Sequence, residues 1–196
     1  MPKNNLLTKM SDKAAKKASL ALSKLSNEKV AVEFAKSAIT KIQSNVLTEI
    51  DPESIVAGVY LPITGEIKGA TLLLFPKKFA FDLCDILAGR KQGTTRQLTE
   101  LDQSAIKEVG NIVCGNLMTV FSNILKVRII EHAPVFSFDM FGAISDQIIV
   151  QFAQKTEEVL TIEIKLSLKN IQIKGYILVV LEVKKIEAIL NRQNLN

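Results

Sequence analysis

Residues 98–125, LTELDQSAIKEVGNIVCGNLMTVFSNIL, carry the clearest helix signal in the chain. Thr99 is a good N-cap residue, and Asp102 stands three positions later, where a capping box needs its partner. Glu100 and Asp102 also put negative charge on the first turn, where the helix dipole stabilises it. We therefore predict a long helix that begins at Thr99 and continues to Leu125.

This predicted helix has one broad apolar face and one polar stripe. On the other side from the apolar face, Ser104, Glu108, Asn111 and Gly115 are spaced by four, three and four residues, so they align along the helix. A glycine costs a helix roughly 1 kcal/mol relative to alanine, which indicates that something approaches closely at Gly115. The apolar residues recur at helical spacing and must pack on another element: Ala105, Ile106, Val109, Ile112, Val113, Leu117, Val120, Ile124 and Leu125.

The polar stripe combines a carboxylate and a carboxamide one turn apart. The carboxylate of Glu108 can pair with a cation, and the carboxamide of Asn111 can both donate and accept hydrogen bonds and so hold a water. Two interpretations fit this pattern: a solvated helix face, or a small catalytic site.

The spacing from these residues to a proline further along the chain favours the catalytic site over the solvated face. Ser104, Glu108, Asn111 and Pro134 stand as S-x3-E-x2-N-x22-P. This arrangement resembles the signature of the CheC, CheX and FliY phosphatases of bacterial and archaeal chemotaxis, which dephosphorylate the response regulator CheY. The segments EVGNIVCGN, DPESIVAGVYLPITGEIKGATLLLF and SFDMFGAI resemble the helix core of that family and the strand regions around it. The resemblance covers the chain from about Asp51 onward.

The resemblance implies a function for the stripe. Hydrolysis of an aspartyl phosphate needs mainly a water held in line with the phosphorus, and the carboxamide of Asn111 is suited to hold it. The resemblance further implies that Glu108 pairs with the active-site lysine of the response regulator, and that the regulator's acidic pocket supplies Mg²⁺. We expect Ser104 to be a surface contact, Gly115 to support the site, and Pro134 to shape the strand entry under the helix.

Relatives of the CheC type also bind the receptor deamidase CheD. The segment SFDMFGAI resembles the part associated with that contact, so Asp139 is the candidate residue. The alternative is a strand-end aspartate that satisfies a turn. An alternative for the whole protein is a non-catalytic adaptor that holds CheD or a response regulator without turnover.

Composition excludes several other classes. The chain has 47% hydrophobic and 23% charged residues, as a globular protein does, and its apolar runs are too short to span a membrane. His132 is the only histidine, which excludes the usual zinc sites and Ser-His-Asp triads. No recognition motif or Trp indicates nucleic acid, and the net charge of +5 favours an acidic protein partner.

Cys84 and Cys114 are expected to be reduced core thiols. Without a signal peptide, we expect a cytoplasmic location.

Along the chain, the pattern predicts an α/β protein with helices packed against a mostly antiparallel sheet. Residues 1–10 are expected to fray, and residues 35–47 fit either a strand or a loop. Residues 62–65 are predicted as a hairpin connection and residues 92–96 as a linker. The other predicted helices are 11–25, 77–88 and 184–191, and the predicted strands are 29–34, 54–61, 66–75, 126–130, 135–144, 147–153, 159–168 and 171–183.

Two similar segments indicate an internal duplication within a single domain that spans residues 1–196. IKGATLLLF at residues 67–75 resembles IKGYILVVL at residues 173–181, and each precedes a predicted helix. We expect repeats at about residues 11–90 and 99–192, related by a pseudo-twofold axis that joins two half-sheets.

Aligning the repeats locates a single site. With Ser23 placed on Ser122, Lys9 stands opposite Glu108 and Asp12 opposite Asn111. The first repeat therefore lacks the Glu and Asn pair, whereas CheC proteins often carry it in both halves. The duplicated length favours the CheC type over the shorter CheX and over FliY, which has an extra C-terminal domain.

Overall fold

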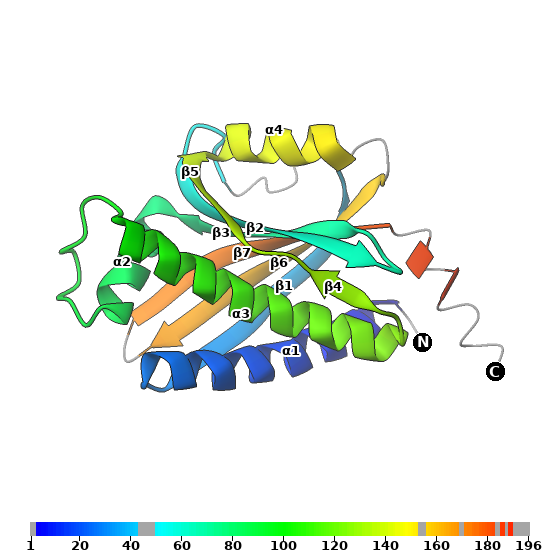
Figure 1. Cartoon of the computed structure of the whole chain (residues 1–196), viewed down its shortest axis with the longest axis horizontal. Coiled ribbons are helices and arrows are strands. Elements are labelled where there is room, and N and C mark those ends of the chain that lie inside the picture. The colour runs from blue at the N-terminus through cyan, green and yellow to red at the C-terminus, as the bar shows by residue number, and fades with distance from the viewer. Residues whose placement is uncertain are drawn as a thin grey trace.

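The fold is a curved antiparallel sheet covered by helices on both faces (Figure 1). The computed structural model describes residues 3–42, 50–152, 156–168, 171–182, 185–186 and 188–189. In this part of the chain the sheet has seven strands in the order β1-β6-β7-β3-β2-β4, and β5 pairs with β2 beside β4. Every strand pair is antiparallel, which confirms the predicted fold class. The elements are α1 (Lys3–Ser26), β1 (Val30–Lys41), β2 (Ile55–Gly65), β3 (Gly69–Pro76), α2 (Lys77–Leu87), α3 (Glu100–Leu125), β4 (Ile129–Glu131), β5 (Val135–Met140), α4 (Phe141–Phe152), β6 (Glu158–Leu168) and β7 (Ile171–Leu181).

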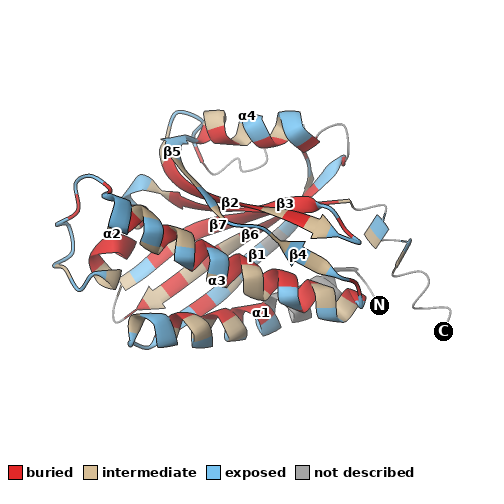
Figure 2. Ribbon diagram, in the orientation of Figure 1, coloured by how far each residue is buried: buried red, intermediate tan, exposed pale blue. Residues whose placement is uncertain are grey.

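The sheet separates two apolar cores, seen as buried residues on both of its sides (Figure 2). The larger core lies between the sheet and α1, α2 and α3, and the smaller one lies under α4. Consecutive residues of β3 alternate between them: Leu73 and Phe75 belong to the larger core, Leu72 and Leu74 to the smaller. Because both faces of β3 are covered, its residues 72–75 form a continuous apolar run without polar alternation.

The two IKG segments form the neighbouring central strands β3 and β7. Their register places Leu72 opposite Leu178, which are equivalent positions of the two segments. Both strand glycines are in close contact with the other strand. A Cβ on Gly69 would lie 2.0 Å from the carbonyl oxygen of Val180, and one on Gly175 would lie 2.6 Å from the ring of Phe75. The duplication stays a prediction, and this pairing is the one that a twofold arrangement requires.

Replacing Gly69 by alanine should strongly destabilise the protein. The new methyl group would overlap a backbone carbonyl, so β3 and β7 would have to separate, and we expect a loss of about 3 kcal/mol in the free energy of unfolding. Gly58→Ala is the matched control, because a Cβ on this strand glycine would meet its nearest atoms at 3.4 Å. Urea denaturation of both variants measures the difference, and equal stabilities would contradict the close packing of β3 on β7.

The predicted hairpin connection at residues 62–65 is wrong, because β2 continues through it to Gly65. Pro62 is tolerated inside the strand because the outer neighbour of β2 changes there, from β5 at Tyr60 to β4 at Ile63. Proline has no N–H to donate to a neighbouring strand, and at this change of partner none is needed. The Pro62 carbonyl accepts a hydrogen bond from the His132 N–H at 3.0 Å. The connection to β3 is the short turn after Gly65, whose φ is +113°.

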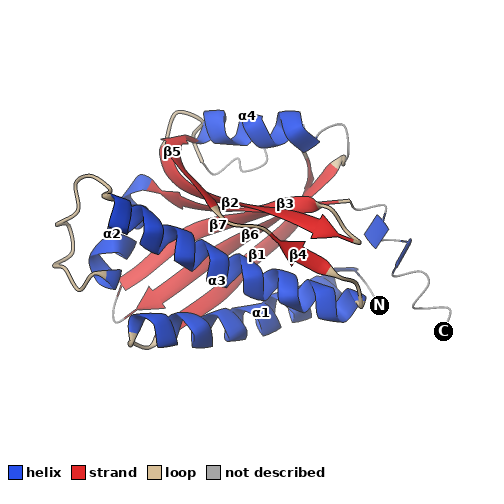
Figure 3. Ribbon diagram, viewed as in Figure 1, coloured by secondary structure: helices blue, strands red, loops and turns tan. Residues whose placement is uncertain are grey.

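The predicted strand at 147–153 is also wrong, and so is the extended structure predicted for residues 141–144. Residues 141–152 form α4 (Figure 3), and residue 153 lies outside the described residues. Phe141, Ile144, Ile148 and Phe152 recur at helical spacing, and all four are buried in the smaller core. A helix can bury these four apolar residues on the second face of the sheet. This burial outweighs the strand preference of the β-branched residues 148–150.

Other element boundaries differ by less. Helix α1 begins at Lys3 instead of fraying up to residue 10, because neither Gly nor Pro interrupts residues 3–26. The open segment after residue 35 continues β1 as far as Lys41, and residues 43–49 lie outside the described residues. Strand β4 is shorter than predicted because Lys126 caps α3 with a left-handed φ of +52°. Of the closing helix, residues 185–186 and 188–189 are helical, and the rest lies outside the description.

None of the helices in the described ranges carries an apolar stretch long enough to cross a membrane. The two cysteines are free and buried, as predicted, with Cys84 on α2 and Cys114 on α3.

Candidate functional site

The N-terminus of α3 is held by the predicted capping box. The Thr99 hydroxyl accepts a hydrogen bond from the Asp102 N–H at 3.2 Å, and the Asp102 carboxylate accepts one from the Thr99 N–H at 3.0 Å. The Thr99 hydroxyl also donates to this carboxylate at 2.7 Å. The helix that carries the polar stripe therefore begins at a defined place and direction.

A largely buried polar network joins this helix start to the end of α2, and no sequence pattern indicated it. The Asp85 carboxylate is inaccessible to solvent and accepts hydrogen bonds from the Thr94 N–H at 2.9 Å, the Thr95 N–H at 3.0 Å and the Thr95 hydroxyl at 2.6 Å. Arg90 then donates to the Thr95 hydroxyl and to Asp102, both at 2.8 Å. These contacts hold the whole connection between α2 and α3 in one conformation.

Both aspartates of this network are ionised more readily than usual. Burial raises the pKa of Asp85, but hydrogen bonds from Thr95 and Thr94 outweigh it and hold that pKa below its ordinary value. In Asp102 the effect of burial is likewise outweighed, here by hydrogen bonds from Thr99 and Arg90, so its pKa is also lowered. The network is therefore formed by charged carboxylates at neutral pH.

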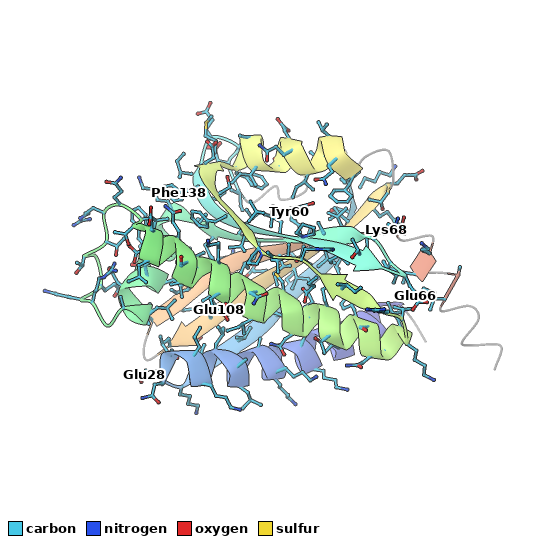
Figure 4. The ribbon with its side chains drawn as sticks, viewed as in Figure 1. Glu28, Tyr60, Glu66, Lys68, Glu108 and Phe138 are labelled. Carbon is cyan, nitrogen blue, oxygen red and sulfur yellow. The ribbon has the colours of Figure 1, made fainter. Side chains whose placement is uncertain are left out.

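Three residues of the polar stripe lie on the outer face of α3, as their spacing predicts, and Gly115 at its end is half-buried against Glu131 of β4. Ser104, Glu108 and Asn111 are exposed, and Figure 4 shows Glu108 on the side of α3 that faces away from the sheet. Among the described residues, no side chain forms a hydrogen bond or ion pair with that of Glu108 or Asn111. A carboxylate and a carboxamide are thus presented together, free to contact a partner.

Gly115 has the close neighbour that its position in a helix suggests. A Cβ built on Gly115 would lie 3.2 Å from Oε2 of Glu131, on β4. The other oxygen of this carboxylate, Oε1, is buried and has no hydrogen-bond partner within the described residues. Burial raises the pKa of Glu131 to about 7. No sequence pattern pointed to Glu131, because the contact joins a strand to a helix across sixteen positions of the chain.

The structure also places the two remaining candidates. Pro134 lies between β4 and β5, where the chain moves along the edge of β2, which suits the predicted role in shaping this passage. Asp139 is exposed near the end of β5, and its carboxylate accepts a hydrogen bond from the Met140 N–H at 2.8 Å. This local bond is the one expected of an aspartate at a strand end, so a role in binding CheD stays a prediction.

The site contains no set of metal ligands of its own. Within the described part of the chain, no three or more His, Cys, Asp or Glu side chains are grouped so that they could hold an ion. The stripe alone offers one carboxylate, one carboxamide and one hydroxyl.

Comparisons with known proteins agree with the sequence pattern. A model of the CheC-like family matches residues 101–137, which include the stripe and Pro134. The CheY-P phosphatase CheC of Bacillus subtilis (strain 168) is 26% identical over 110 residues, covering 55% of this chain and 53% of the relative. The chain therefore aligns with about half the length of this curated relative.

Solved structures share the fold over nearly the whole chain. FliY of Thermotoga maritima has a TM-score of 0.76 at 20% identity and covers 97% of this chain and 96% of its own. A chain of the CheX-CheY-BeF3-Mg²⁺ complex from Borrelia burgdorferi has a TM-score of 0.52 at 14% identity, covering 86% and 96%. At these identities the likeness concerns the fold alone. The family model over residues 101–137, the curated relative at 26% identity and the shared fold thus make this chain similar to the CheC-like family.

Proposed function

We propose that this protein is a phosphatase that hydrolyses the aspartyl phosphate of a response regulator of the CheY type. One observation carries the proposal: Glu108 and Asn111 are exposed one turn apart, and their side chains have no partner among the described residues. They stand on a helix whose start is fixed by the capping box and the Asp85 network. This pair lies within the stretch that the CheC-like family model matches.

Asn111 is the residue that positions the attacking water. An aspartyl phosphate is an activated acyl phosphate, so a water oxygen forms a bond to phosphorus while the bond from phosphorus to the aspartate oxygen breaks. The products are a free carboxylate and inorganic phosphate, which takes the protons of the water. A carboxamide that accepts a hydrogen bond from this water directs its lone pair at the phosphorus, and such positioning is a main source of catalysis in phosphoryl transfer.

Glu108 is the docking residue in this proposal. Its carboxylate would form a charge-assisted hydrogen bond with the active-site lysine of the regulator, one helical turn from the water held by Asn111. Mg²⁺ would be held by the acidic pocket of the regulator, since the stripe offers too few oxygen ligands to hold it alone. The CheX relative forms a complex with CheY that includes BeF3 and Mg²⁺, which supports this division of labour.

We propose only one working site. In the aligned register Asp12 of α1 takes the place of Asn111, and it is exposed. A carboxylate accepts hydrogen bonds but cannot donate them, and it would repel a phosphoryl group. The first repeat would then serve as scaffold. Its helix α1 packs into the larger core through residues spaced by four, such as Ala14, Ala18 and Leu22.

The test is the decay of acyl-phosphorylated CheY from the same organism in the presence of Mg²⁺. The native protein should accelerate the decay, and Glu108→Gln should raise the KM for the regulator by about tenfold through loss of a charge pair. Glu100→Gln is the matched control, because Glu100 is exposed on the first turn of the same helix and outside the stripe.

Absence of acceleration despite complex formation would contradict the phosphatase proposal. The remaining reading would be an adaptor, whose binding of CheD through Asp139 can be tested by pulling CheD down with Asp139→Ala.

A further inference from the structure

Glu131 is a carboxylate that the proposed mechanism does not use. It ends the short edge strand β4, where it pairs with Ile63 of β2. Ile129, two residues earlier, packs against the larger core, and side chains two apart in a strand point to the same face. The carboxyl group of Glu131 therefore reaches from the sheet to α3, where Gly115 leaves room for it at 3.2 Å from the position of a Cβ.

Gly115 stands one turn after Asn111 on the same stripe of α3. Positions four apart on a helix have Cβ atoms about 5–6 Å from each other, so Oε2 of Glu131 lies within roughly 9 Å of the Cβ of Asn111. The close approach at Gly115 thus brings a second carboxyl group to the edge of the proposed site. A phosphoryl group held near Asn111 would lie within the range of its charge.

We propose that Glu131 is a specificity-determining residue of this site: its carboxyl group, seated against Gly115, admits a phosphoryl group beside Asn111 when protonated and opposes it when ionised. This inference rests on the proposed phosphatase function.

Besides the docking carboxylate Glu108 of the stripe itself, Glu131 is the acidic group that sets the charge next to Gly115. From α3 it faces Cys114, whose pKa burial raises to about 12, so this thiol is neutral. Oε1 of Glu131 has no partner among the described side chains, and burial raises the pKa of Glu131 to about 7. Nearby, the ring of His132, the residue after β4, contacts the hydroxyl of Thr64 on β2 at 2.8 Å.

A second acidic group lies close to this part of the sheet. Glu66, in the turn after β2, accepts a hydrogen bond from the Arg128 N–H at 2.8 Å through its carboxylate. Figure 4 shows Glu66 near the end of the sheet, away from Glu108 on the middle of α3. Of Glu66 and Glu131, it is therefore Glu131 that lies against the polar stripe, at Gly115.

The sign of the effect follows from charge. As the pH rises through about 7, Glu131 loses its proton, and the carboxylate repels the dianionic phosphoryl group of the regulator. The affinity of the native protein for an activated regulator should fall about three- to tenfold across this interval, beyond any change intrinsic to the regulator. Glu131→Gln keeps the shape of the side chain and removes its proton equilibrium.

The experiment compares binding of the CheY regulator from the same organism, activated by beryllofluoride and Mg²⁺, to native protein and Glu131→Gln between about pH 6 and about pH 8.5. The two proteins should bind equally well at the acidic end, and the variant should bind about three- to tenfold more tightly at the alkaline end. Glu157→Gln, which changes an exposed carboxylate before β6, is the matched control and should follow the native curve.

Parallel curves for native protein and Glu131→Gln would overturn the inference. Because the readout is binding, it is separate from the phosphatase test: a protein that binds without accelerating decay would refute the catalytic proposal and still report on Glu131. Failure to bind the activated regulator at any pH would overturn both.

Discussion

Replacing Asn111 by alanine should reduce the acceleration of phospho-regulator decay about 100-fold. The carboxamide is the group that orients the attacking water, and alanine cannot accept the hydrogen bond that holds this water in line with the phosphorus. The free energy of unfolding should change by less than about 0.5 kcal/mol, because Asn111 is exposed and its side chain has no partner among the described residues. Single-turnover decay of phosphorylated CheY at saturating variant measures the effect on chemistry apart from binding.

Two further variants show whether orientation of water is the cause. Asn111→Asp keeps the shape but exchanges the amide for a carboxylate, and it reproduces the Asp12 of the first repeat, so it should be as inactive as the alanine variant. Asn123→Ala removes an exposed asparagine from the last turn of the same helix and should keep native activity. An Asn111→Ala variant with native turnover would refute the proposed role of the amide.

Replacing Asp85 by alanine should strongly destabilise the protein. The carboxylate is inaccessible to solvent, and its loss leaves the two N–H groups of Thr94 and Thr95 and the Thr95 hydroxyl without their acceptor. Each buried donor left unsatisfied costs about 1 kcal/mol or more, so the free energy of unfolding should fall by about 3 kcal/mol. Guanidinium denaturation measures this loss, and Asp146→Ala, an exposed aspartate on α4, is the matched control.

The same network predicts the direction of acid sensitivity. Asp85 and Asp102 have lowered pKa values in the folded protein, so the folded state binds protons less readily than the unfolded chain. Their contribution to stability is present above the ordinary aspartate pKa of 3.8 and is lost as the pH falls through the folded values. Asp85→Asn should therefore show a weaker loss of stability than the native protein on acidification below about pH 4. An unchanged acid profile would contradict the charged state of Asp85.

Local patterns in the sequence determined much of the fold. The capping residues Thr99 and Asp102 and the apolar periodicity that follows them predicted α3, since both signals depend on residues within a few turns of one helix. Strict alternation predicted β6, whose apolar residues from Ile162 to Leu168 face one core. The spacing of Ser104, Glu108 and Asn111 predicted their common exposed face for the same local reason.

Elements whose conformation depends on a distant partner were not predicted. Residues 147–153 contain a β-branched run that is typical of a strand. A helix is favoured instead because it buries Phe141, Ile144 and Ile148 together on the second face of the sheet. Pro62 is typical of a turn, and only the change of partner strand along β2 makes it acceptable inside a strand.

Helical spacing identified the residues of the candidate site: Glu108 and Asn111 one turn apart, and a glycine that needed a close neighbour. Their surroundings depend on how the helices pack on the sheet. This packing placed Glu131 against Gly115 and tied Asp85 through Thr95 and Arg90 to the start of α3. These contacts join side chains from different elements, and the packing of helix on sheet brings them together, so no local spacing records them.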